Sequence, residues 1–154
     1  MDSKLFTEKY LLNEVKLIEA ANVRLHLLSA IVHGIETAGA LLDPLPFKAK
    51  GQGRKRFDLA LNKLFPKAYS TANSELDLYN LLRSHMAHCM LPAKQIVVTL
   101  SAEHHLQLIN GQLEIDLKTF YKHYIQAMDK LIQLIETNQV KNKRIVFDNL
   151  NFGH

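Results

Sequence analysis

The chain of 154 residues has one cysteine, no tryptophan, six glycines and four prolines. Its lone Cys89 excludes an intrachain disulfide framework and a zinc module built from several cysteines. No apolar run approaches the roughly 18–20 residues that span a bilayer. The first residues, MDSKLFTEKY, place charges where a secretory signal needs an apolar stretch. These absences predict a soluble, cytoplasmic protein that does not enter a membrane.

The length is that of one folded unit. A domain of this size buries roughly 68–70% of the surface of its unfolded chain, so it folds without disulfides or metal staples. We therefore expect a single domain over residues 1–154. Within it, residues 138–154 either pair as a final short strand or form a loose tail.

The charge is only mildly basic, with 19 Lys and Arg against 15 Asp and Glu and a formal net charge of +4. One stretch, from Pro44 to Phe57, contains no acid. Its basic residues are Lys48, Lys50, Arg54, Lys55 and Arg56. Such a cluster can meet a phosphate backbone, although a short basic run is more often a solvated loop. Its GQG lacks the Gly-Lys-Ser/Thr ending of a P-loop, which excludes that class of nucleotide site.

Apolar residues at spacings of three and four predict helix over most of the N-terminal half. The pattern from Leu5 to Leu42 fits two helices that break near Asn22, or one long bent helix. Gly34 and Gly39 inside it indicate close backbone packing. The helix must end by Asp43, because prolines follow. A short helix with Phe57, Leu61 and Leu64 inward then ends before Pro66.

The second half mixes helices with a small hairpin. Ser74 is a suitable N-cap for a helix that Pro92 ends. Alternating residues around Asn110-Gly111 predict a hairpin between Gln95 and Leu117. Its inward residues would be Leu106, Leu108, Leu113 and Ile115. A last helix runs from Lys118 to about Thr137. The fold class is therefore mainly α, a bundle of about five helices with a β-hairpin between the last two.

The segment Leu78–Pro92, LYNLLRSHMAHCMLP, holds the best candidate site. Arg83, Ser84, His85 and His88 fall within six residues near the end of a helix. A guanidinium binds phosphate with two parallel hydrogen bonds, and an imidazole moves protons near neutral pH. No acidic cluster accompanies them, so a two-metal nuclease is not indicated.

The geometry of one helix does not aim all these groups at one atom. At about 100° per residue, Arg83 and His88 lie about 140° apart around an ideal α-helix. Ser84 and His88, four residues apart, share a face. The long Arg83 side chain, fraying at the helix end, or a symmetry-related second copy would have to complete the site.

The segment resembles the motif of the HEPN superfamily of small helical proteins. In that motif an arginine is followed, after four to six residues, by a histidine near a helix end; here four residues separate Arg83 from His88, and a polar residue comes directly after the arginine. The resemblance implies a homodimer in which two motif helices face each other across a cleft. It also implies metal-independent RNA cleavage, in which a ribose 2′-hydroxyl attacks the adjacent phosphate without a cofactor. Arg83 would then hold the phosphate, His88 would be the acid or base, and Ser84 the polar helper, with His85 a further candidate. A toxin with an antitoxin protein as partner, or a host-defence module, is the expected setting.

Other interpretations stay open. Ser84 stands where many HEPN members carry Asn, Asp or His, so a non-catalytic dimer that binds RNA, a nucleotide or a protein is the main alternative. Arg83 can instead pair with Glu36 or with helix carbonyls, and the motif helix can simply form a dimer interface. Zinc binding would need His85, His88 and Cys89 with His104 or His105. His123 is expected to be exposed.

Overall fold

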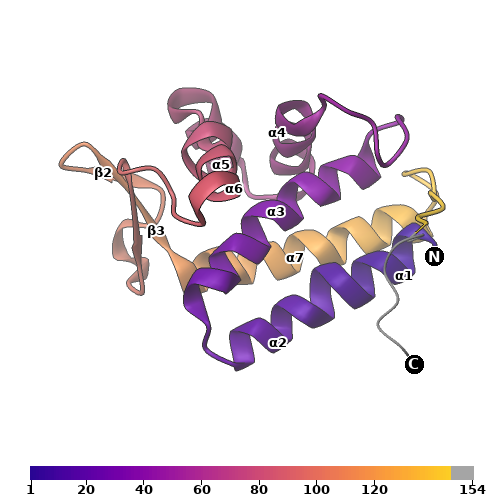
Figure 1. Ribbon diagram of the computed structural model, residues 1–154, viewed down its shortest axis with the longest axis horizontal. Coiled ribbons are helices and arrows are strands. Elements are labelled where there is room, and N and C mark those ends of the chain that lie inside the picture. Colours follow the sequence, from indigo (N-terminus) through magenta and orange to yellow (C-terminus); the bar gives the residue numbers. More distant parts are fainter. Residues whose placement is uncertain (147–154) are drawn as a thin grey trace.

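The structure is a computed structural model that describes residues 1–146. Most of this part is helical (Figure 1), as the sequence predicted. The α-helices are α1 (Ser3–Phe6), α2 (Glu14–Ala20), α3 (Arg24–Leu42), α4 (Gly53–Leu64), α5 (Lys67–Leu76), α6 (His85–Cys89) and α7 (Leu117–Glu136). Two π-helical segments are η1 (Thr7–Asn13) and η2 (Tyr79–Ser84), and η3 (Ala102–His104) is a 3-10 helix.

The N-terminal half forms two long helices rather than one. Segments α1, η1 and α2 follow each other without interruption from Ser3 to Ala20. The chain then turns at Asn22, whose φ of 57° is left-handed, and α3 begins at Arg24. Asparagine tolerates this backbone region better than most residues, so the break lies where the sequence predicted it. Helix α3 ends at Leu42, before the prolines, also as predicted.

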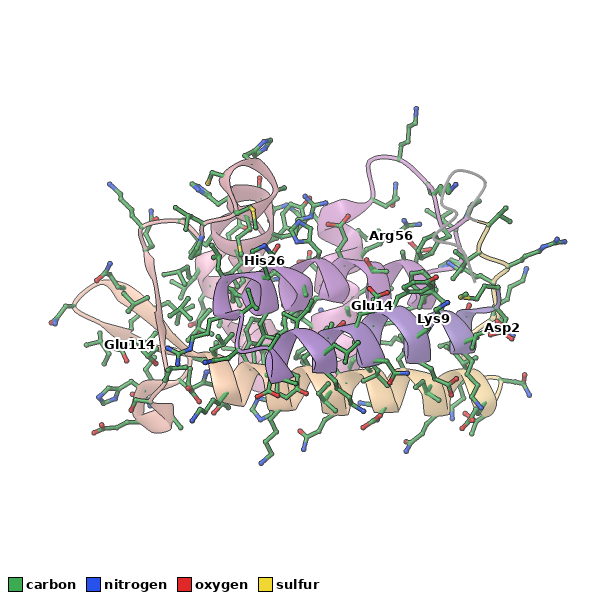
Figure 2. The ribbon with its side chains drawn as sticks, turned by 60° about the horizontal axis from the view of Figure 1, so that its bottom comes forward. Asp2, Lys9, Glu14, His26, Arg56 and Glu114 are labelled. Carbon is green, nitrogen blue, oxygen red and sulfur yellow. The ribbon has the colours of Figure 1, made fainter. Side chains whose placement is uncertain are left out.

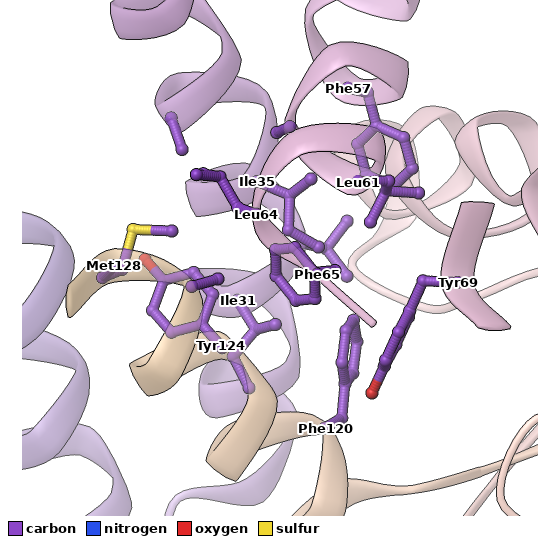
Figure 3. Packing of buried hydrophobic residues seen from close by; sticks show 14 of the residues in the cluster. Ile31, Ile35, Phe57, Leu61, Leu64, Phe65, Tyr69, Phe120, Tyr124 and Met128 are labelled. Atoms are coloured by element: carbon purple, nitrogen blue, oxygen red, sulfur yellow. The ribbon is translucent and has the colours of Figure 1, made fainter. Parts of the chain in front are cut away.

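Helix α3 is the centre of the fold. It packs against α2, α4 and α7, and Figure 1 shows it crossing α7 between α2 and α4. Its inward residues include Ile31 and Ile35, which lie in one core cluster with Phe65 and the α7 residues Phe120 and Tyr124 (Figure 3). Both glycines of α3 lie in tight contacts: Gly34 faces the ring of Tyr124, and Gly39 faces the backbone of Arg56. The predicted close packing is confirmed.

Helix α3 is also long and apolar enough to cross a membrane, which the sequence analysis had not anticipated. A buried core helix passes the same test of length and composition. Here 56% of the apolar window is buried inside the protein, so packing against its neighbours accounts for the composition of α3.

The prediction that Ser74 caps a helix is wrong. Ser74 lies inside α5, which begins after Pro66 and ends where Asp77 takes a left-handed φ of 57°. The next helical segment, η2, begins at Tyr79 and continues directly into α6. A two-residue break therefore separates α5 from the segment that carries the motif.

A three-stranded sheet lies at one end of the molecule (Figure 1). Strands β2 (Gln107–Ile109) and β3 (Gln112–Asp116) form the predicted hairpin, with positive φ at Asn110 and Gly111. Strand β1 (Ile96–Thr99) adds to β3 in parallel. Of the predicted inward residues, Leu113 and Ile115 are buried and Leu106 is half-buried. The prediction is wrong for Leu108, which lies on the edge strand β2 and is 56% exposed.

The end of the described chain returns to the N-terminus. The Ile145 N–H donates to the Met1 carbonyl at 2.8 Å, and Asp2 and Arg144 form an isolated β-bridge. Ile145 is buried. The predicted final strand is thus reduced to one bridge, and the part of the predicted tail from 147 to 154 lies outside the described residues.

Candidate functional site

The motif begins in a π-helical turn. The His85 N–H donates to the Asn80 carbonyl, five residues back, which widens the helix at η2. Leu82 and Met86 are buried and fix this segment on the core. Turns of this kind are rare and occur frequently at functional sites. The segment ends at Met90, whose φ of 60° is left-handed, two residues before Pro92.

Arg83 points toward α3 and forms an ion pair with Glu36 through its Nε atom. Both side chains are about one-quarter exposed. Within residues 1–146, Nη1 and Nη2 of Arg83 make no hydrogen bond to the protein. A guanidinium has five N–H donors in a fixed fork. Glu36 therefore holds Nε of the guanidinium and leaves Nη1 and Nη2 open to an anion.

The sequence analysis named Glu36 as a partner of Arg83 in its structural interpretation of the motif. That contact is present, but it uses only one donor of the guanidinium. The ion pair alone therefore does not account for the whole side chain.

The N-terminus of α4 lies directly behind this pair. A Cβ atom on Gly53 would lie 2.6 Å from the Tyr79 hydroxyl and 3.2 Å from Oε1 of Glu36. A side chain at position 53 would thus displace both residues. The Arg54 guanidinium lies 4.8 Å from the centre of the Tyr79 ring and binds Asp77 at 2.5 Å. The start of α4 therefore packs against Tyr79 of η2 and against Glu36 of α3, the residue that binds Arg83.

Ser84, His85 and His88 lie on the outer side of η2 and α6. His85 and His88 are exposed, and Ser84 is half-buried. Across the described residues, neither histidine ring is hydrogen-bonded to Arg83. The exposed Cys89 thiol donates to the His85 carbonyl at 3.3 Å. The fold brings the predicted site residues onto one segment but does not join Arg83 to His88 within one protomer.

The predicted basic cluster is divided by the fold. Lys48, Lys50 and Lys55 are exposed, and Arg54 is exposed but paired with Asp77. Arg56 was wrongly placed among the phosphate-binding candidates. It is buried, with Nε 2.6 Å from Oδ2 of Asp43 and its terminal nitrogens bound to the Pro46 and Phe47 carbonyls.

Asp43 is the centre of a buried ionic cluster. Lys143 also binds it, at 3.2 Å, and caps the carbonyls of Ala40 and Leu45. Burial by itself would raise the pKa of Asp43, but the hydrogen bonds from Arg56 and Lys143 bring that pKa below its ordinary value. The cluster holds the loop after α3 and the end of the described chain in place.

A second group of polar side chains was missed by the sequence analysis. The buried Tyr69 hydroxyl lies 2.8 Å from Nε2 of His105 and 2.9 Å from Nδ1 of His123. The Asp116 N–H donates to Nδ1 of His105 at 3.1 Å. His123 is therefore half-buried, not exposed as predicted. These residues come from α5, α7 and the loop before β2, and no sequence spacing indicates their contact.

This relay of hydrogen bonds has a defined direction. Because Nδ1 of His105 accepts a backbone N–H, its proton is assigned to Nε2, which donates to Tyr69. The Tyr69 hydroxyl then donates to His123. The zinc interpretation fails on the same geometry: His105 is engaged here, and the described residues contain no group of three His, Cys, Asp or Glu that could hold a metal.

Comparisons with protein-family models, with curated proteins and with solved structures found no match for this chain. What the site does must follow from its own side chains.

Proposed function

We propose that this protein is a metal-independent endoribonuclease of HEPN type that acts as a homodimer. The observation that carries the proposal is the state of Arg83. Its Nε is held by Glu36, while both terminal nitrogens lack a hydrogen-bond partner among residues 1–146. Arg83 lies on the π-helical turn that contains Ser84 and continues into His85 and His88. A preorganised guanidinium on the same helical segment as two exposed imidazoles supports attack on a phosphodiester when a second copy of the chain brings His88 to Arg83.

The chemistry requires no metal or cofactor. Arg83 would bind the non-bridging oxygens of the phosphate and stabilise the charge that grows on them. The ribose 2′-oxygen attacks phosphorus as its proton is removed, and the bond to the 5′-oxygen breaks as that oxygen gains a proton. His88 supplies acid–base catalysis, and Ser84 offers a hydroxyl to the same phosphate. The products are a 2′,3′-cyclic phosphate end and a 5′-hydroxyl end.

The exposed lysines would supply the rest of the RNA contact. Lys48, Lys50 and Lys55 lie on the loop and first turn around the start of α4, and Gly53 in that turn packs against Tyr79 and Glu36. Contacts of this kind attract any phosphate backbone, so they weaken as salt rises. A cytoplasmic setting and an inhibitory partner protein belong to the same proposal.

The test is cleavage of a structured RNA in EDTA by wild type and by Arg83→Ala and His88→Ala. The proposal expects loss of cleavage in both variants, with retained folding. Arg24→Ala is a matched control, because Arg24 is an exposed arginine on α3 whose hydrogen bond goes to the neighbouring Asn22. Equal cleavage by all four proteins would overturn the assignment of Arg83 and His88.

A non-catalytic dimer that binds RNA or a nucleotide is the second candidate. It is favoured by the exposure of His88, whose ring has no hydrogen-bonding residue to orient it within the described chain. In this case wild type binds RNA, Arg83→Ala weakens the binding, and no cyclic phosphate product forms. A defined scissile product excludes it.

A further inference from the structure

A stripe of polar residues runs along the outer face of α3, past the site. Its members recur at spacings of three and four: His26, Ser29, His33 and Glu36. His26 is exposed and projects from the helix (Figure 2), and the other three are half-buried. The core residues Ile31 and Ile35 lie on the opposite side. The stripe ends at the residue that holds Arg83.

His33 is the imidazole of this stripe nearest to Glu36. Residues three apart on a helix have Cβ atoms about 5–6 Å from each other, on the same face. Arg83 reaches the same face from η2 to bind Glu36. His33 therefore lies on the same face of α3 as the residue that binds Arg83, whereas His88 is exposed on α6.

The ring of His33 is held in one orientation. Its Nδ1 lies 2.8 Å from the Ser29 carbonyl, one turn back. A carbonyl oxygen only accepts, so Nδ1 carries the proton and, in the neutral ring, Nε2 has a free lone pair. Within residues 1–146, Nε2 has no hydrogen-bonding partner. An imidazole held through Nδ1, with Nε2 free of a partner among the described residues, is placed to accept a proton.

We propose that His33 is the general base of the cleavage reaction, a role that rests on the proposed ribonuclease function. With the phosphate on Arg83, Nε2 of His33 takes the proton of the 2′-hydroxyl as the 2′-oxygen forms its bond to phosphorus. The bond from phosphorus to the 5′-oxygen breaks, and His88 gives that oxygen a proton. Solvent then takes the proton from His33 and returns one to His88.

The first test measures single-turnover cleavage in EDTA against pH. His33→Ala is expected to lower the rate by roughly 10²–10⁴-fold, the range for loss of a general acid or base. A base acts only when deprotonated, so the variant also loses the rise in rate at the acidic end of the profile. His88→Ala loses the fall at the alkaline end instead. His26→Ala, two turns away on the same stripe, keeps the wild-type rate and profile.

The second test uses an RNA in which sulfur replaces the scissile 5′-oxygen. A thiolate leaves without a proton, so this substrate restores cleavage by His88→Ala but not by His33→Ala. Binding of uncleavable 2′-deoxy substrate should be the same for wild type and His33→Ala, which excludes misfolding as the cause of a loss.

The outcomes separate the two proposals. If Arg83→Ala abolishes cleavage while His33→Ala cuts at the wild-type rate with an unchanged acidic limb, His33 is not the base and the ribonuclease stands. Rescue of His33→Ala by the sulfur substrate also overturns the assignment. If wild type and Arg83→Ala are equally inactive on RNA, the ribonuclease fails and the role of His33 fails with it.

Discussion

Two arginines of this chain show how differently one side chain can be used. Arg56 is buried, and Nε and both terminal nitrogens bind Asp43 and backbone carbonyls. Arg83 is partly exposed, and in the part of the chain that the structure describes only its Nε is bound, by Glu36. A buried charge must be fully paired, whereas an open fork can be left at the surface at little cost. The difference in pairing assigns Arg56 to stability and leaves Arg83 available for the phosphate of the proposed reaction.

Glu36 is expected to matter through Arg83. Glu36→Ala removes the acceptor of the Arg83 Nε hydrogen bond, so the guanidinium is no longer held in place. A misplacement of about 1 Å at a catalytic group can cost on the order of 10²-fold in rate, and we expect a loss of that order. Glu36→Gln keeps an oxygen that accepts from Nε, so it should recover most of the rate. Single-turnover cleavage and RNA affinity, measured on both variants, check this. Equal loss in both variants would show that Glu36 acts through its charge and not by orienting Arg83.

Asp43→Ala leaves two buried cations, Arg56 and Lys143, without their carboxylate. Breaking one side of a buried ion pair typically costs about 3–5 kcal/mol. We expect a loss of that order in the free energy of unfolding, measured by urea denaturation. Lys48→Ala, an exposed change in the same loop, should shift it by less than about 0.5 kcal/mol. A similar small shift for Asp43→Ala would contradict the stabilising role of the cluster.

At the scale of the helices, the close approach of α3 and α4 decides whether replacing a glycine by alanine raises or lowers the free energy of unfolding. Replacing a helical glycine by alanine ordinarily stabilises by roughly 0.5–1 kcal/mol. A Cβ on Gly39 would overlap the Arg56 carbonyl, which is backbone and cannot rotate away. Gly39→Ala is therefore expected to destabilise by about 1–3 kcal/mol, the cost of overpacking. The melting temperatures of Gly39→Ala and of Ser29→Ala, a change at a half-buried position of α3, are compared with that of wild type. Only Gly39→Ala should melt well below wild type.

The relay from His105 through Tyr69 to His123 joins α5, α7 and the loop before β2, and it should make stability depend on pH. Burial lowers the pKa of both histidines below 6.5, helped for His105 by His123 and for His123 by Lys122. The nearby Asp116 opposes this at His105. The unfolded chain then takes up protons at a higher pH than the folded chain, so stability is present above pH 6.5 and is lost as pH falls below it.

Urea midpoints at pH 7.5 and 5.5 measure this loss. Wild type should unfold at lower urea at pH 5.5, and the variant His105→Gln with His123→Gln should show a smaller difference between the two pH values. An equal difference in both proteins would place the titrating groups elsewhere.

The sequence predicted most helix boundaries correctly, because turn residues and apolar spacing depend on neighbouring residues alone. The break at Asn22, the end of α3, the hairpin at Asn110-Gly111 and the last helix all follow from turn residues and apolar spacing. The errors at Arg56 and His123 come from contacts between residues far apart in the sequence. The burial of Arg56 depends on Asp43 and Lys143, and that of His123 on Tyr69. The Ser74 error has a local cause: a serine suited to an N-cap lies inside α5, and the left-handed Asp77 ends that helix instead.

The candidate site was found only in part for the same reason. The group at Arg83–His88 is contiguous in sequence, so its presence on one helical segment was predictable. Pairing of Arg83 with Glu36 was one of the alternatives that the sequence offered. The π-helical turn, and a pairing that uses Nε of Arg83 and not its terminal nitrogens, depend on how η2 packs on α3. No periodicity along the chain contains that information.

At the scale of the whole molecule, the directions of Arg83 and His88 determine how many chains form one active site. Arg83 turns inward to Glu36, and His88 is exposed on the outer side of α6. If two protomers face each other across the motif, His88 of one chain can reach the phosphate held by Arg83 of the other. His33 lies three residues before Glu36, the residue of α3 that binds Arg83, so His33 and Arg83 are expected to serve the same proposed site from the same chain. In the proposed dimer, each site is therefore expected to combine Arg83 and His33 of one chain with His88 of the other.

Mixing inactive variants tests this arrangement. Arg83→Ala and His88→Ala, combined in equal amounts under conditions of subunit exchange, form heterodimers in which one of two sites has both native groups. With random pairing, about a quarter of the wild-type activity should return. Arg83→Ala mixed with His33→Ala should give no recovery, since both groups come from one chain. Light scattering on each mixture verifies that dimers are present. Absence of recovery in the first mixture, with exchange demonstrated by labelled subunits, would place Arg83 and His88 of one chain in one site and remove the need for a partner copy.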